Sequence, residues 1–112
     1  MMMLIKAIVR PGKIDDIKDM LEMLNLPGMT VIEVRGHGRR QKSLTTTYRG
    51  QEYDVSLLPK SMIEIVVEDD HLERVVDALM TTARTGEIGD GRIFVLPVQR
   101  SYNIRTGEKD VL

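Results

Sequence analysis

The sequence predicts an α+β fold of the ferredoxin-like kind, in which one antiparallel sheet packs against two helices. The first observation is the order of the elements, which reads β-α-β, then a long polar connection, then β-α-β again. The second is that each helical stretch carries one apolar stripe, as expected of helices that cover one sheet face. Two such halves with right-handed crossovers form a βαββαβ sandwich, with the long loop between the second and third strands.

The first half begins with a strand over residues 4–10, which ends at Pro11. A helix follows, because apolar residues then recur at helical spacing. Its stripe consists of Ile14, Ile17, Met20, Leu21 and Leu24. Pro27 and Gly28 cannot continue this helix, and the β-branched run over residues 29–35 predicts the second strand.

The second half repeats the pattern, with the third strand predicted over residues 61–67. Asp69 and Asp70 then supply the negative charge that favours a helix N-terminus. The apolar stripe of this helix consists of Leu72, Val75, Val76, Leu79, Met80 and Ala83. Residues 92–98 predict the fourth strand, in which Pro97 indicates an edge or a strand end.

The third strand is apolar on both of its sides. Met62 and Ile63 are followed by Ile65, Val66 and Val67, so little polar surface is left on either face. Two helices cover only one face of the sheet, and an exposed apolar patch usually marks an interface. We therefore expect the chain to associate with copies of itself.

Composition limits the function classes. The 112 residues predict a single domain over residues 1–112, and 42% hydrophobic content is typical of a globular protein. The 16 basic and 17 acidic residues leave no basic excess for nucleic-acid binding. There is no cysteine, which excludes disulfides and thiolate metal sites. No apolar run approaches the ~20 residues that span a bilayer, so we expect a cytoplasmic protein.

The connection from Gly36 to Lys60 is too long for a compact domain of this size unless it has a function or is disordered. Exposed Tyr and Arg side chains on such a loop are residue types that dominate interfaces. The candidates for partner contact are Tyr48, Arg49 and Tyr53. A hairpin extension in solvent is the plainer reading, and we favour a partner-contacting loop over about residues 37–57.

The segment between the second helix and the fourth strand is rich in glycine. Gly86, Gly89 and Gly91 allow successive backbone N–H groups to point into one concavity, and Arg92 follows directly. Such a concavity beside a guanidinium suits phosphate or carboxylate oxygens. The alternative is that Gly86 caps the helix and the other two glycines shape a turn.

Several multi-residue motifs, in order from about Leu4 to Glu108, resemble the PII nitrogen-regulatory signal-transduction proteins. The matching segments are residues 28–31, 33–38, 48–53, 58–60, 85–86, 89–95 and 104–108. The resemblance implies a cytoplasmic homotrimer with no catalytic residue, which binds ligands and regulates a target protein through the long loop.

The resemblance also implies that the chain binds ATP or ADP. The matching nucleotide-binding positions are Ile8, Thr30, Gly38, Glu64, Val66, Gly89, Asp90, Gly91, Arg92 and Arg105. Arg92 stands where many relatives have Lys, and with Arg105 it is expected to hold the polyphosphate from two sides. Asn103 stands where many relatives have Arg, which removes one cation from the expected phosphate contacts.

The family also binds Mg²⁺ and 2-oxoglutarate. The matching positions for the acid are Gln41, Lys60 and Gly89, and Gln41 is also the metal ligand. Aligning Gln41 with the family motif requires one extra residue, placed at Arg39, and Ser43 replaces a family glycine. The implied targets are an ammonium transporter, a nitrogen-assimilation enzyme or a nitrogenase system, so a membrane is contacted only through a transporter. Tyr53 matches a tyrosine that some bacterial relatives modify.

Two other function classes compete with a sensor. A glycine nest with an Arg on a ferredoxin-like fold also suits a small hydrolase of phosphate esters or acyl phosphates. A passive trimeric scaffold needs no ligand at all. No Ser-His-Asp arrangement, paired-carboxylate motif or metal-ligand cluster stands out in the sequence, which speaks against an enzyme.

Overall fold

The fold was obtained as a computed structural model, which describes residues 1–26, 28–37, 44–48, 51–55 and 57–112, with the backbone alone for 44–48 and 51–55. The elements in chain order are β1 (Met2–Val9), the 3-10 turn η1 (Pro11–Lys13), α1 (Ile14–Met23), β2 (Thr30–Gly36), β3 (Leu44–Tyr48), β4 (Gln51–Val55), β5 (Leu58–Glu68), α2 (Asp69–Ala83) and β6 (Arg92–Val98). The predicted order is confirmed, with one hairpin added inside the long connection.

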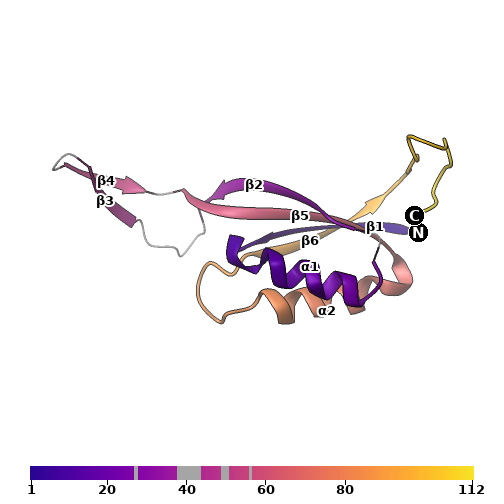
Figure 1. The fold of residues 1–112 in the computed structure, drawn as a ribbon, viewed down its shortest axis with the longest axis horizontal. Helices are drawn as coiled ribbons and strands as arrows, with labels where there is room; N and C mark the ends of the chain where they lie inside the picture. The colour runs from indigo at the N-terminus through magenta and orange to yellow at the C-terminus, as the bar shows by residue number, and fades with distance from the viewer. Residues whose placement is uncertain (27, 38–43, 49–50, 56) are drawn as a thin grey trace.

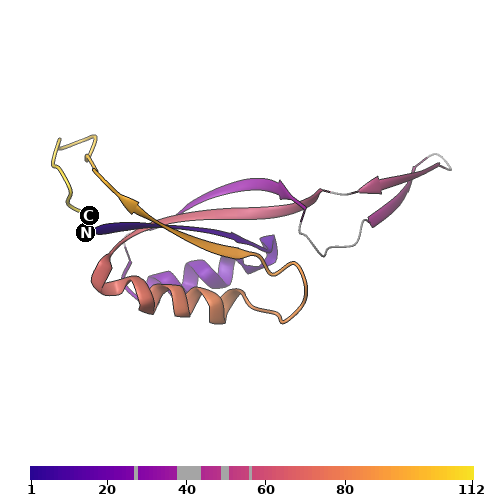
Figure 2. The ribbon, with the colours of Figure 1, turned by 180° about the vertical axis from the view of Figure 1, so that it is seen from behind.

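The main sheet has four antiparallel strands in the order β2-β5-β1-β6. Both α1 and α2 lie on one face of it (Figure 1), which confirms the ferredoxin-like arrangement. Strand β6 forms an edge, as Pro97 indicated. Strands β3 and β4 pair only with each other and lie beyond one end of the main sheet (Figures 1 and 2).

The two ends of the sheet differ in what they carry. The chain termini and the segment after β6 lie at one end, whereas the α2–β6 turn and the long connection lie at the other (Figures 1 and 2). This separation decides which of the predicted site residues meet within one chain.

The hydrophobic core lies between the sheet and the two helices. Alternate residues of β1 and β5 point into it, among them Ile5, Ile63 and Ile65, and they meet Ile17 of α1 and Leu79 of α2. Each of these side chains is almost completely buried, which contributes roughly 1.5–3 kcal/mol apiece by transfer from water.

The end of the first helix agrees with the sequence prediction, whereas β1 and β5 begin earlier than predicted, at Met2 and at Leu58. Helix α1 ends before Pro27, because Asn25 takes up a left-handed conformation with φ of 55°. Strand β5 begins at Leu58 rather than at residue 61, although Pro59 follows directly. Pro59 pairs only with Arg35 of β2, since β1 has already ended opposite Ser61, so its missing N–H breaks no ladder on the other side.

The second face of the sheet carries no helix and is rich in apolar side chains. On β6, Phe94 is 46% and Leu96 is 41% exposed, and their register partners on β1 are Lys6 and Leu4. This open face matches the uncovered apolar surface that the sequence predicted.

Candidate functional site

The glycine turn, residues 84–91, connects α2 to β6. Helix α2 ends at Ala83 and Arg84 is already extended, so Gly86 does not cap the helix as the alternative reading supposed. Gly86, Gly89 and Gly91 all have positive φ, at 90°, 102° and 106°. A Cβ atom added at Gly91 would lie 1.7 Å from the backbone oxygen of Ile8, so this position admits no side chain.

The Asp90 carboxylate organises this turn from the inside. It accepts hydrogen bonds from the backbone N–H groups of Thr85 and Gly86, at 2.8 and 2.9 Å, and one from the Thr85 hydroxyl. The Thr85 hydroxyl, and after it the Arg10 guanidinium, hold the pKa of Asp90 well below its usual range. Asp90 is therefore a carboxylate at any physiological pH, and its charge is directed into the turn.

Arg10, at the end of β1, ties the turn to the sheet. Its Nε donates to Asp90 Oδ1 at 3.0 Å, and a terminal nitrogen donates to the Ile88 carbonyl at 2.9 Å. One guanidinium thus holds two points of a segment about 80 residues further along the chain. No local pattern in the sequence marks this role.

Lys60, near the start of β5, is only 8% exposed and donates from Nζ to the Gly89 carbonyl at 2.6 Å. Burial, and after it the positive charge of Arg10, lower the pKa of Lys60, while Asp90 opposes that shift. A Cβ added at Gly36 would lie 3.6 Å from Lys60 Cγ, so the lysine also packs beside the last residue of β2. Lys60 therefore joins the glycine turn to both ends of the long connection.

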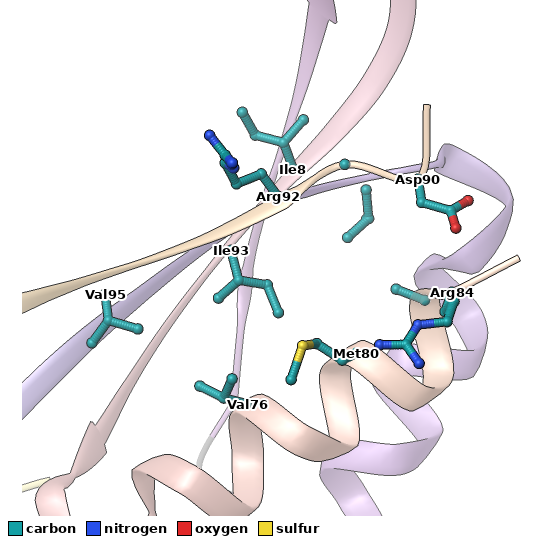
Figure 3. Close-up of a pocket in the computed structure, with 11 residues that line it drawn as sticks. Ile8, Val76, Met80, Arg84, Asp90, Arg92, Ile93 and Val95 are labelled. Carbon is teal, nitrogen blue, oxygen red and sulfur yellow. The ribbon is translucent and has the colours of Figure 1, made fainter. Parts of the chain in front are cut away.

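A cleft of about 430 Å³ lies beside the turn, between α2 and β6. Its lining residues are Ile8, Val9, Val76, Met80, Ala83, Arg84, Asp90, Gly91, Arg92, Ile93 and Val95. Figure 3 shows Arg84 beside Met80 on the helix side, with the Asp90 carboxylate turned away from the cleft. Arg92 lies opposite Ile8 in the sheet register, and within the described part of the chain its guanidinium forms no ion pair. Ile8, Gly89, Asp90, Gly91 and Arg92 are thus brought together.

Three of the remaining predicted nucleotide-binding residues lie beside a different hollow. Thr30, Glu64 and Val66 line a second hollow of about 490 Å³, together with Tyr102 and Asn103 from the C-terminal segment. Thr30 and Glu64 are direct partners in the register of β2 and β5, and Lys6 lies opposite Glu64 on β1. Glu64 is only two residues along β5 from Met62, the register partner of Ile8. The C-terminal segment that completes this hollow lies at the end of the sheet opposite the glycine turn (Figure 1).

The C-terminal segment forms an ordered turn around Asn103. The Asn103 side-chain oxygen accepts hydrogen bonds from the N–H groups of Arg105 and Thr106, at 2.9 and 3.0 Å, and the Asn103 carbonyl accepts one from Gly107. Asn103 therefore shapes the turn that presents Arg105, a role that sequence comparison alone did not suggest. Arg105 is exposed and follows the far end of β6, so one chain does not bring it to Arg92.

Some predicted residues cannot be placed. Gly38, Gln41 and Arg49 lie outside the described residues. Tyr48 and Tyr53 lie on the two strands of the β3–β4 hairpin, of which the backbone is described. Among the described residues there is no group of three or more His, Asp or Glu side chains that could hold a metal ion. No helix in the described part of the chain is long and apolar enough to cross a membrane.

Comparison with known proteins shows the family to which the chain belongs. Residues 2–108 match the model of a family described as nitrogen regulatory protein P-II. The chain is 54% identical over 106 residues to a nitrogen regulatory protein P-II of Microchaete diplosiphon, which covers 95% of this chain and 94% of that one. With the same coverage it is 55% identical to the P-II protein of Synechocystis sp. and 54% identical to P-II 1 of Escherichia coli K12.

A small α+β signalling protein, rather than an enzyme, is the class that these relatives define. The chain belongs to the nitrogen regulatory P-II family, as the sequence motifs predicted. The hydrolase alternative is thereby wrong, because the relatives are named as regulators.

Proposed function

We propose that this chain is a cytoplasmic sensor of nitrogen and energy status, which binds ATP or ADP together with 2-oxoglutarate and regulates a target protein through the loop over about residues 37–57. The observation that carries the proposal is the position of Lys60. Its ammonium contacts the Gly89 carbonyl of the glycine turn, and its own strand begins where the long connection ends. A ligand that binds Lys60 therefore acts on the turn and on the loop base at once.

The nucleotide is proposed to lie between two copies of the chain. One copy supplies the glycine turn and Arg92 for the phosphates, and its neighbour supplies the hollow at Thr30 and Glu64 together with Arg105. Within one chain Arg105 follows the end of β6 and Arg92 begins that strand, so a second copy is needed to bring the two cations to one ligand. The open apolar sheet face supports such an assembly, which we propose is a homotrimer.

The acid is proposed to bind at the inner end of the same site. Lys60 pairs with one carboxylate of 2-oxoglutarate, the backbone of Gly89 contributes a hydrogen bond, and Gln41 contributes to a Mg²⁺ ion shared with ATP. Mg²⁺ prefers oxygen ligands from substrate phosphates and few protein groups, which agrees with a site that lacks an acidic cluster among the described residues.

The target is proposed to be an ammonium transporter, a nitrogen-metabolism enzyme or a nitrogenase system. Tyr48, Arg49 and Tyr53 are the proposed contact residues, and Tyr53 is a candidate for covalent modification. A membrane is contacted only through a transporter partner, and no nucleic-acid partner is proposed, because the formal charge is −1.

Calorimetric titration tests this function. Mg-ATP and ADP should each bind, and 2-oxoglutarate should bind more tightly when Mg-ATP is present. Arg105→Ala should weaken ATP binding by about 1.5–3 kcal/mol, because it removes charge-assisted contacts. Arg74→Ala, which removes an exposed arginine of α2, is the matched control and should bind normally. A wild-type chain that binds neither nucleotide nor acid contradicts the proposal.

A further inference from the structure

Asp90 carries a charge of the wrong sign for the place it occupies. It lies between Gly89 and Gly91, where the proposed ligands bring phosphate and carboxylate groups. The negative charge of Asp90 would repel these anionic groups. In the structure, however, the Asp90 carboxylate accepts its hydrogen bonds from Thr85, Gly86 and Arg10. Figure 3 shows the carboxylate pointing away from the neighbouring cleft.

Hydrogen bonds, rather than apolar burial, hold this turn. Thr85, Gly86 and Glu87 are exposed, and the Ile88 side chain is 66% exposed. A segment without buried side chains opens at low cost in free energy unless polar contacts restrain it. The Asp90 carboxylate accepts three of these hydrogen bonds, from Thr85 and Gly86. The backbone N–H of Glu87 donates a further one to the Thr85 hydroxyl oxygen at 3.1 Å.

The position of Gly89 depends on the same contacts. Arg10 holds the residue on either side of Gly89, through the Ile88 carbonyl and the Asp90 carboxylate. The Gly89 carbonyl between them accepts the hydrogen bond from Lys60 at 2.6 Å. A change at Asp90 therefore moves the partner of the buried Lys60 ammonium as well.

We propose that Asp90 is a positioning residue of the anion site. Through Thr85, Gly86 and Arg10 it holds the glycine turn in the shape that presents Gly89 to the ligand and to Lys60, and its carboxylate does not touch the ligand. This inference rests on the proposed function, and it reassigns the predicted role of Asp90 from contact with the nucleotide to support of the turn.

The sign of one mutational effect distinguishes a positioning role of Asp90 from a purely electrostatic one. Asp90→Asn removes a negative charge beside an anion site, so a purely electrostatic role predicts tighter binding of Mg-ATP and 2-oxoglutarate. The positioning role predicts the opposite. The amide NH₂ of Asn would face either the N–H groups of Thr85 and Gly86 or the guanidinium of Arg10, and one set of contacts would be lost.

The experiment measures the affinity of the wild-type chain, Asp90→Asn and Asp77→Asn for Mg-ATP and for 2-oxoglutarate with Mg-ATP. Asp77 is exposed on α2, so its variant carries the same change of charge outside the turn. We expect Asp90→Asn to weaken both ligands by about tenfold and Asp77→Asn to leave them unchanged. Amide exchange without ligand should rise at Thr85 and Gly86 in the Asp90 variant alone.

Equal or tighter ligand binding by Asp90→Asn overturns the inference, whatever its amide exchange. A wild-type chain that binds neither ligand instead overturns the proposed function, so the two failures are distinguishable. If Asp90→Asn does not fold, the same titrations are made with Thr85→Val, which removes the hydroxyl group that donates to Asp90. The positioning role predicts that this variant also binds both ligands more weakly than the wild-type chain.

Discussion

At the scale of single residues, Gly91 is the most constrained position of the site. Its backbone passes so close to Ile8 that no other residue fits, and its φ of 106° disfavours any side chain. The sequence indicated that glycines matter here, because three of them follow a helix. It did not distinguish a glycine at which any side chain would clash with a neighbouring strand from one that only the positive φ favours.

Gly91→Ala and Gly86→Ala separate these two requirements. Both positions have positive φ, but a Cβ at Gly86 meets nothing within 4 Å. We expect Gly86→Ala to lower the free energy of unfolding by about 1–2 kcal/mol, and Gly91→Ala by about 2–4 kcal/mol because the turn must also move away from β1. Urea denaturation measures both values, and equal losses would show that the contact with Ile8 is not restrictive.

Asp90 and Arg10 show why residue roles were harder to predict than residue positions. Motif comparison assigned Asp90 to the nucleotide, whereas its carboxylate is bonded within the glycine turn in the structure. Its actual partners include a guanidinium 80 positions away in the chain, and only the folded sheet brings that group into reach. Asn103 is a second example, because the sequence indicated only a lost cation and the structure shows in addition that its side chain shapes the C-terminal turn.

At the scale of elements, the sequence predicted all four strands of the main sheet and both helices. The buried core residues lie on β1, β5 and the two helices. Strands β2 and β6 have no fully buried residue and were predicted from their β-branched and apolar runs. The hairpin β3–β4 was predicted only as the plainer alternative for the long connection. Its five-residue strands pair with each other and not with the main sheet, so no core-facing pattern marks them in the sequence.

Removal of the long connection tests whether it belongs to the fold. Replacement of residues 40–53 by a short linker should leave a folded protein of unchanged oligomeric state that still binds some nucleotide, because the buried core lies on β1, β5, α1 and α2. Thermal unfolding, light scattering and nucleotide titration measure these properties. Unfolding or dissociation of the shortened chain would show that the loop is structural. Binding to the target should be lost.

At the scale of the whole molecule, the open face of the sheet and the distance between Arg92 and Arg105 along β6 both support the proposed assembly of several copies. Leu96 faces Leu4 across β6 and β1, is 41% exposed, and is predicted to be buried in the homotrimer. A charge introduced there would be desolvated on assembly and would strongly oppose it.

Leu96→Asp should therefore give a folded monomer, whereas Met23→Asp should remain a trimer. Met23 is 84% exposed on α1 and lies outside the open face, so the same kind of change there adds only a surface charge. Light scattering of both variants measures the mass. A trimeric Leu96→Asp variant would show that another surface mediates assembly.

Coupling between the acid and the long loop is the central claim of this account. In the structure, the Lys60 ammonium is bound to the Gly89 carbonyl, so a carboxylate that binds Lys60 must compete with this contact. The glycine turn and the base of the loop should then change together. By linkage, a target that prefers one loop state must change the affinity for the acid by the same factor.

Hydrogen exchange over residues 36–60, with Mg-ATP alone and with Mg-ATP plus 2-oxoglutarate, tests this claim most directly. Ordering costs roughly 1–2 kcal/mol for each residue fixed, so protection should rise at the loop base, near Gly36 and residues 57–60, rather than along the whole loop. Exchange at Gly89 should change in the same experiment. Identical exchange in both states, with binding of the acid established by calorimetry, would contradict the account.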